Sequence, residues 1–324
     1  MTILAESTVH TLDPFVFRIT DTFGPRWYGV SYALGFVAAW LVLRWLSRTG
    51  RTPLRPELLG DFITWCIVGV VVGGRLGHVL LYERDILWTF SSSFPFWELL
   101  AIHRGGMASH GGITGVILAS ILFARRHGIA PLAVIDTSAF IAPAGLMFGR
   151  LANWVNGELV GKVLPASMQA SPPWWSVKYP REAIDLAGSA ASREQAEHLV
   201  TMAYAGDPRA ISEVAALVPA RYPNNFIQAF TDGPMLMLVL VAVWWRPRLA
   251  GTLSGAFLMG YGALRFCSEQ YREPDSTVLF NAGPAGDVTS PILVSVLMIA
   301  IGAAVVALRP RGGPLIGGVR PRPA

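Results

Sequence analysis

Charged residues are scarce in this sequence of 324 residues. Asp, Glu, Lys and Arg make up 15% of it, whereas hydrophobic residues make up 52%. Soluble globular domains carry about 25% charged residues, so this composition argues against a single solvent-facing globule. The positive mean hydropathy of +0.46 points the same way. We therefore predict an all-α, polytopic membrane protein.

Cysteine is also scarce, since Cys66 and Cys267 are the only two. Both lie in apolar segments, so they predict neither a disulfide framework nor a metal site. No metal-ligand set, nucleophile elbow or phosphate loop is present, and we expect no cofactor. A cleavable signal peptide is not evident either, because the mixed polar start carries Asp13 and Asp21. The first apolar segment is expected to serve as an uncleaved anchor.

Seven apolar segments are long enough to cross a bilayer, which needs roughly 20 residues each. They cover about 27–46, 59–82, 108–124, 132–155, 227–245, 252–269 and 291–308. Arginines gather in every second loop: Arg48, Arg51 and Arg55; Arg125 and Arg126; Arg246 and Arg248; and Arg309, Arg311, Arg320 and Arg322. By the positive-inside rule these loops are cytoplasmic, which puts the N-terminus outside and the C-terminus inside.

The chain is expected to divide into four parts. These are a membrane part over 1–155, an extracytoplasmic head insertion over 156–225, a second membrane part over 226–308 and a disordered basic tail over 309–324. In the head, Ser192 and Gln195 predict a capping box at the start of a polar helix. The net charge of +5 reflects the arginine-rich loops, and the tail lacks interleaved aromatic residues. Nucleic acid is therefore not an expected partner.

The most informative segment is 149–161, where Arg150, Asn153, Asn156 and Glu158 end a strongly apolar run. A charged side chain at hydrocarbon depth costs a few kcal/mol, so it usually faces a cavity or a polar partner. The alternative is an arginine that snorkels from the helix end to the headgroups. Arg150 and Asn153 are three residues apart and share one helix face. Glu158 either orients this cluster or is a solvated loop residue.

Polar residues from five predicted spans reach the same outer level: Tyr28, Arg75, His110, Arg150 and Arg265. Snorkelling explains one such arginine but not the whole set, so we predict a shared outward-opening site. Several arginines at headgroup depth suggest a phospholipid headgroup as the ligand, with a soluble phosphate compound as the rival. His110 lies between glycines and has the chemistry of a proton acceptor, although a lone histidine at a membrane boundary is more often an interfacial hydrogen-bonding residue.

Several ordered motifs resemble those of the bacterial prolipoprotein diacylglyceryl transferases. The segment 149–161 resembles the signature of that family almost position for position. Others follow in order: Trp27-Tyr28-Gly29, residues 73–77 with Arg75, residues 105–112 with His110, Asp136 ahead of Pro143, and residues 260–275 with Arg265 and Glu269. The resemblance covers almost the whole chain except the head and the tail.

The resemblance implies seven transmembrane helices in the bacterial inner membrane and a specific reaction. Such enzymes move the diacylglyceryl group of phosphatidylglycerol to the lipobox cysteine of a prolipoprotein, forming a thioether and releasing glycerol phosphate. It implies Arg150 and Arg265 as the clamp on the departing phosphate and His110 as a base or a positioning group. The residues expected to bind substrate are Tyr28, Arg75, Asn153, Asn156, Glu158, Gly161 and Glu269.

The chain departs from the family pattern in three places. Residues 222–228 stand where His-Pro-Ser-Gln-Leu-Tyr-Glu is usual, so Ile227 and Gln228 replace a phenol and a carboxylate. His78 stands for a tyrosine, and residues 108–109 differ before the histidine. We expect activity to be reduced or retuned, with an excess of positive charge at the site. A diverged member acting on another lipid or acceptor, and a non-catalytic lipid-binding or lipid-moving protein, are the alternatives.

Overall fold

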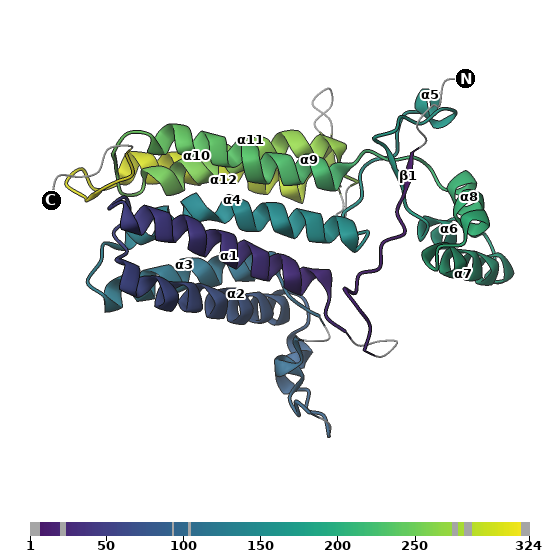
Figure 1. Cartoon of the computed structure of the whole chain (residues 1–324), viewed down its shortest axis with the longest axis horizontal. Coiled ribbons are helices and arrows are strands. Elements are labelled where there is room, and N and C mark those ends of the chain that lie inside the picture. The colour runs from purple at the N-terminus through teal and green to yellow at the C-terminus, as the bar shows by residue number, and fades with distance from the viewer. Residues whose placement is uncertain are drawn as a thin grey trace. The chain divides into compact units, whose positions relative to one another are not determined.

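The computed structural model describes residues 7–19, 24–92, 94–102, 105–273, 278–281 and 287–318. Its long helices are α1 (Trp27–Arg48), α2 (Leu59–Leu81), α3 (Ser109–Arg126), α4 (Pro131–Val155), α11 (Thr252–Ser268) and α12 (Ser290–Leu308). A further helical run joins α9 (Asn224–Phe230), the π-helix η5 (Thr231–Met235) and α10 (Leu236–Trp244). All seven segments predicted to cross the membrane are thus helical (Figure 1).

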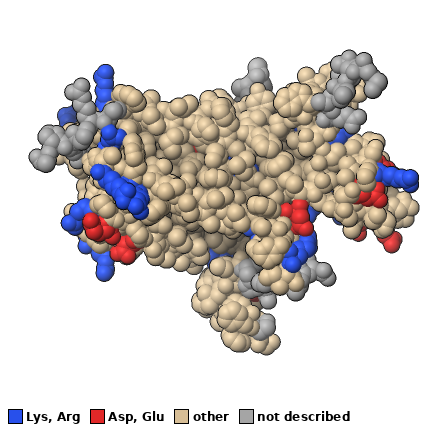
Figure 2. All heavy atoms as spheres, in the orientation of Figure 1, with Lys and Arg blue, Asp and Glu red and all other residues tan. Residues whose placement is uncertain are grey.

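Five helices in the described ranges are long and apolar enough to cross a membrane. They are α1, α2 with the turn before it, α4, the run from α9 to α10, and α12. The other two predicted spans do not meet these criteria of length and hydropathy. Helix α11 has only 17 residues, and α3 begins with the weakly apolar residues Ser109-His110-Gly111-Gly112. Figure 2 shows few charged side chains over the helices on the face in view. Large apolar side chains of α1, such as Val37 and Leu41, are exposed to the surroundings. Such a surface suits lipid.

The chain forms two compact units. Unit 1 comprises 1–35, 143–238 and 258–300, and unit 2 comprises 36–142, 239–257 and 301–324. Each unit takes residues from both of the predicted membrane parts, because several long helices contribute to both units. The predicted division into a head and two membrane parts stays a prediction.

In unit 2, helices α2 and α3 lie side by side along facing glycines (Figure 1). A Cβ added to Gly69 would lie 2.6 Å from the carbonyl oxygen of Gly115, and one added to Gly77 would lie 2.6 Å from the Cα of Gly111. Small residues at four-residue spacing let two backbones approach this closely, as membrane helix pairs often do. The core of the unit contains Phe62 and Phe123, whose ring centroids are 5.1 Å apart.

The described part of the tail after α12 contains one short strand. This strand, β6 (Leu315–Ile316), pairs antiparallel with β3 (Arg248–Leu249) in the loop after α10. A Cβ added to Gly317 would lie 2.7 Å from the Trp244 ring, so this close approach needs glycine. The expected disorder from residue 309 stays a prediction, and within that segment the structure describes one short strand, whose partner is not revealed by composition. The rest of the tail lies outside the described residues.

Unit 1 contains the predicted head. Strand β1 (Thr8–Val9) pairs in parallel with β2 (Val177–Lys178). Helices α6 (Glu182–Asp185), α7 (Ala190–Tyr204) and α8 (Pro208–Leu217) enclose a small apolar core that includes Val200 and Val214 (Figure 1). The capping box of α7 pairs Ser189 with Ser192, three residues earlier than predicted. Ser192 is the third residue of that helix. Its hydroxyl accepts a hydrogen bond from the Ser189 amide, which closes the box.

The remaining elements are short. They are α5 (Ala166–Gln169), the 3-10 turns η1 (Pro56–Leu58), η2 (Arg84–Trp88), η3 (Glu98–Leu100) and η6 (Glu269–Tyr271), and the hairpin of β4 (Val278–Asn281) with β5 (Asp287–Thr289).

Candidate functional site

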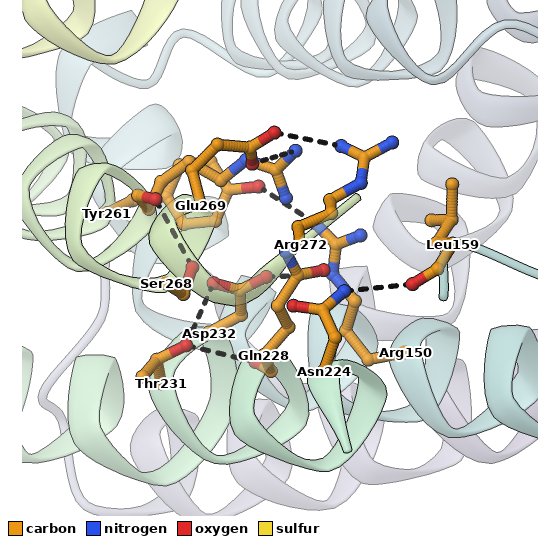
Figure 3. Close-up of polar contacts among 11 residues, drawn as sticks. Arg150, Leu159, Asn224, Gln228, Thr231, Asp232, Tyr261, Ser268, Glu269 and Arg272 are labelled. Atoms are coloured by element: carbon orange, nitrogen blue, oxygen red, sulfur yellow. Dashed lines mark hydrogen bonds and ion pairs between the residues drawn. The ribbon is translucent and has the colours of Figure 1, made fainter. Parts of the chain in front are cut away.

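Arg150, near the end of α4, forms a buried ion pair with Asp232 of η5. Its Nε donates to an Asp232 oxygen at 2.8 Å, and the side chains are 13% and 0% exposed. Its Nη2 also donates to the Tyr261 hydroxyl of α11 at 3.5 Å (Figure 3). The Arg150 guanidinium is therefore held by side chains from two other helical elements, whereas a snorkelling arginine would reach the headgroups.

The π-helix explains how Asp232 reaches Arg150. Pro234 has no N–H, and its ring would clash with a carbonyl of the preceding turn in a regular helix, so the turn widens. Gly233 allows α4 to come close, because a Cβ there would lie 2.7 Å from the Met147 side chain. Local sequence thus fixes a wide turn whose carboxylate points at the end of α4.

Helix α11 and the turn η6 that follows it contribute a polar stripe at four-residue spacing, formed by Tyr261, Arg265 and Glu269. Nη2 of Arg265 lies 3.2 Å from one Glu269 oxygen, and Nη1 of Arg272 lies 3.5 Å from the other. Glu269 and Arg272 are both buried. A single carboxylate therefore lies between two guanidinium groups, as Figure 3 shows for Glu269 and Arg272.

Charge within this group does not cancel. Arg150, Arg265 and Arg272 carry three positive charges, and Asp232 and Glu269 carry two negative ones. Burial lowers the pKa of Arg272, while the Glu269 carboxylate acts in the opposite direction. Because guanidinium does not deprotonate in proteins, the group keeps a net positive charge among apolar helices. It is suited to an anionic ligand.

A second polar group joins the start of α1 to the end of α4. The Tyr28 hydroxyl lies 2.5 Å from Oδ1 of Asn153 and 2.6 Å from Oε2 of Glu158. A phenol has one proton, so one of these contacts takes the hydroxyl as donor and the other needs the Asn153 amide to turn and donate. The structure thus brings Tyr28, Asn153 and Glu158 together, although the Glu158 side chain is exposed. Their predicted part in binding substrate stays a prediction.

The loop after α4 is held by backbone contacts. The Asn156 side chain donates to the Ala152 carbonyl at 2.8 Å, which completes the helix end. Gly161 bridges to Arg272, and a Cβ there would lie 2.9 Å from the Tyr222 carbonyl carbon. The structure gives Asn156 and Gly161 these supporting contacts, and their predicted part in binding substrate stays a prediction.

Arg221 connects the loop after α4 with the helices of the head. The sequence did not single out this residue. Its Nη1 donates to the Gly161 carbonyl at 2.8 Å, and it pairs with Glu182 at 2.6 Å and Glu273 at 3.1 Å. Burial raises the pKa of Glu182, and the Arg221 guanidinium opposes that shift. This arginine therefore supports the geometry of the site from outside the arginine group.

Known proteins match this chain over most of its length. The family model described as prolipoprotein diacylglyceryl transferase matches residues 14–308. The chain belongs to this family. A relative from Bdellovibrio bacteriovorus is 36% identical, with 85% of this chain and 87% of the relative aligned. Relatives from Rhodospirillum centenum and Azospirillum brasilense are 35% identical over 92% and 91% of this chain and 94% of each relative. All three are named phosphatidylglycerol–prolipoprotein diacylglyceryl transferase.

Membership of the prolipoprotein diacylglyceryl transferase family, together with the apolar helices, makes this a multi-pass protein of the bacterial inner membrane. Within the described residues, no group of three or more His, Cys, Asp and Glu side chains could hold a metal ion.

Two of the predicted site residues, Arg75 and His110, belong to unit 2. Arg75 is buried and donates to four backbone carbonyls, those of Glu98, Leu99, Gly105 and Gly106. Four of its five N–H groups are thus used to hold this loop. His110 is exposed in the first turn of α3. Whether these residues join the arginine group, as the predicted shared site requires, stays a prediction.

Sequence reasoning missed Asp232 and the stripe to which it belongs. Asn224, Gln228 and Asp232 follow at four-residue spacing and are all fully buried. That spacing within an apolar span was a signal, because a polar stripe on a membrane helix faces its interior. Asp232 supplies a carboxylate to Arg150 one turn beyond Gln228. The group of three arginines and two carboxylates still keeps a net positive charge.

Proposed function

We propose that this protein transfers the diacylglyceryl group of phosphatidylglycerol to the lipobox cysteine of prolipoproteins. The family match over 14–308 and the names of its relatives support this reaction. The structural observation that carries the proposal is the buried group of Arg150, Arg265 and Arg272 with only two carboxylates. Guanidinium groups held in fixed positions bind phosphate oxygens in pairs, so this group suits an anionic headgroup.

In the proposed reaction the cysteine sulfur attacks the carbon that joins the diacylglyceryl group to phosphate. A carbon–sulfur bond forms, the carbon–oxygen bond breaks, and its electron pair leaves with glycerol phosphate. Arg150 and Arg265 stabilise the charge that develops on the leaving phosphate. His110 accepts the thiol proton, because the thiolate is the attacking form.

The other predicted site residues bind or position the substrates. Tyr28, Asn153 and Glu158 form one hydrogen-bonded group that presents a phenol and an amide beside Arg150. Glu269 fixes the orientation of Arg265 and Arg272. Asn156, Gly161 and Arg75 hold the loops that border the substrate.

For the membrane arrangement we propose seven spans, with the N-terminus and the head outside and the C-terminus inside. The alternation of arginine-rich loops supports this orientation. It places the end of α4 on the outer side, where a secreted prolipoprotein is accessible.

Transfer is tested with the purified protein in phosphatidylglycerol nanodiscs and a lipobox peptide. We expect the peptide to gain the mass of one diacylglyceryl group on sulfur and an equal amount of glycerol phosphate to be released. A peptide with serine in place of cysteine is the control. Lipid binding without either product would favour the non-catalytic lipid-binding alternative and contradict the proposal.

A further inference from the structure

The side-chain amide of Gln228 is fully buried in the arginine-rich part of unit 1. Its exposure is 0%, and in the described part of the chain neither Oε1 nor Nε2 has a hydrogen-bond partner. Burying an amide without partners costs free energy, and native proteins rarely leave both of its atoms unmatched. A buried polar group of this kind indicates a ligand that supplies the missing partners.

The side chains one turn before and one turn after Gln228 are also buried and polar. Asn224 precedes it by one turn and Asp232 follows it by one turn, and Figure 3 shows these side chains reaching from one helix toward Arg150 and Arg272. Oδ1 of Asn224 and Nη1 of Arg265 are further buried atoms without a hydrogen-bond partner. The unmatched atoms thus include a cationic donor, a neutral acceptor and an amide that does both.

This combination matches the chemistry of a phosphate that carries a polyol. Guanidinium groups match the phosphate oxygens, whereas the Gln228 amide, both donor and acceptor, matches hydroxyl groups. An ammonium headgroup has only donors, so it would leave Nε2 of Gln228 unmatched. It would also add a positive charge to a group that already has three cations and two anions.

We propose that Gln228 is a specificity-determining residue, whose amide hydrogen-bonds the glycerol hydroxyls of the phosphatidylglycerol headgroup. The proposal rests on the function proposed above. It differs from that function in assigning recognition of the hydroxyls to one residue, separately from the arginines that hold phosphate.

The test compares phosphatidylglycerol with phosphatidylpropanol, which keeps the phosphodiester charge and lacks both headgroup hydroxyls. Both are used as short-chain lipids with the full-length protein in detergent. Two quantities are measured: kcat/KM for transfer to a lipobox peptide, and Kd from calorimetric titration without peptide. We expect the parent protein to prefer phosphatidylglycerol about tenfold in both, which is the discrimination that one good hydrogen bond gives.

Gln228→Met is the test variant, because methionine has a similar shape and no hydrogen-bonding amide. We expect it to bring the two lipids within about twofold of each other, while the midpoint of thermal unfolding stays the same or rises, since a buried unmatched amide is removed. Gln228→Leu is the second variant, for the case in which methionine packs poorly. Gln195→Leu removes an exposed amide of α7 and should keep the tenfold preference.

A preference that survives in Gln228→Met and Gln228→Leu would overturn the inference, and so would an equal loss with both lipids. Absence of a thioether in the parent would contradict the proposed function instead. In that case the Kd ratios of parent and variants still decide whether Gln228 recognises the hydroxyls.

Discussion

Arg150 shows how one side chain is made specific by its neighbours. Its Nε donates to Asp232 and its Nη2 donates to the Tyr261 hydroxyl, so the guanidinium is fixed in direction before any ligand binds. A buried ion pair is weak evidence for stability, because desolvation of both charges offsets their attraction. Its value here is orientation: a fixed fork loses less entropy on binding phosphate than a mobile one.

Arg150→Lys tests the fork. Lysine keeps the charge but has no planar pair of donors, so we expect transfer to fall by about 100-fold or more, as when one preorganised donor is removed from a developing anion. The measurement is kcat for thioether formation, with solubility and unfolding midpoint as checks on folding. Arg193→Lys on the exposed face of α7 is the matched control. Near-parental turnover of Arg150→Lys would remove Arg150 from the phosphate clamp.

His110→Gln tests the proposed base. Glutamine keeps hydrogen bonding but accepts no proton at neutral pH, so the rate should fall strongly at pH 7. The loss should shrink as pH rises toward the thiol pKa of about 8.5, where the cysteine ionises unaided. The rate ratio of variant to parent is measured from pH 6.5 to 9.5. A constant ratio over that range would show that His110 positions the substrate instead.

At the scale of elements, the close contact of α2 with α3 and the pairing of β1 with β2 hold segments of the chain in place. Helices α2 and α3 approach through glycines because their carbonyl and Cα atoms occupy the space of a side chain. Strand β1 holds the N-terminal segment against β2, and the amides of Thr8 and His10 donate to Ser176 and Lys178 at 2.9 Å.

Gly69→Ala should destabilise unit 2, because the new Cβ would lie 2.6 Å from the Gly115 carbonyl oxygen, a backbone atom that cannot turn away. Overpacking of this kind costs about 1–3 kcal/mol. Gly60→Ala on the same helix meets nothing within 4 Å and is the control, expected to be neutral or stabilising. Thermal unfolding in detergent compares the two. Equal midpoints would mean that the helices separate at no cost.

Acidification should loosen β1 because of His10. Its ring is buried beside Trp154 and Tyr179, at centroid distances of 5.7 Å and 5.4 Å, and burial lowers its pKa. The free residue titrates near 6.5, so the released strand takes up a proton more readily than the docked one. The contribution to stability is present above that pH and is lost as pH falls through the lowered pKa.

Hydrogen exchange of the Thr8 and His10 amides measures this loss. Between pH 7.5 and pH 5, protection should fall in the parent relative to His10→Phe, which keeps an aromatic ring and does not titrate. Comparison at each pH removes the intrinsic effect of pH on exchange. Parallel protection profiles in the two proteins would show that His10 does not titrate on release.

At the scale of the whole molecule, charge in the loops sets orientation. The arginine-rich loops predict a cytoplasmic C-terminus and an outer head. Single cysteines at Ser192 and Arg126 in a background without Cys66 and Cys267 should respond in opposite ways to an impermeant thiol reagent. We expect labelling at position 192 in intact spheroplasts and at position 126 only after lysis. The reverse pattern would put the arginine group on the wrong side for a secreted substrate.

The sequence by itself determined that the chain is helical, apolar and a member of its family. Apolar runs of 20 residues have few stable alternatives to helices in a membrane, because every backbone group must be paired internally. The helix starts at Trp27, Leu59 and Thr252 agree with the predicted segments to the residue. The sequence also singles out Arg150, Asn153 and Arg265 as candidates, because polar groups in apolar runs are costly and therefore informative.

Only the tertiary structure decided how those groups are partnered. Asp232 lies 82 residues from Arg150, and Glu158 lies 130 residues from Tyr28, so nothing in local spacing joins them. Asp232 pairs with Arg150 because a π-helical turn directs its side chain toward the end of α4. A pattern of 3.6 residues per turn does not describe such a turn. Strand β6 is similar, because it exists only through its pairing with β3. Local pattern fixes helices, whereas the partner of a buried charge depends on which helices pack together.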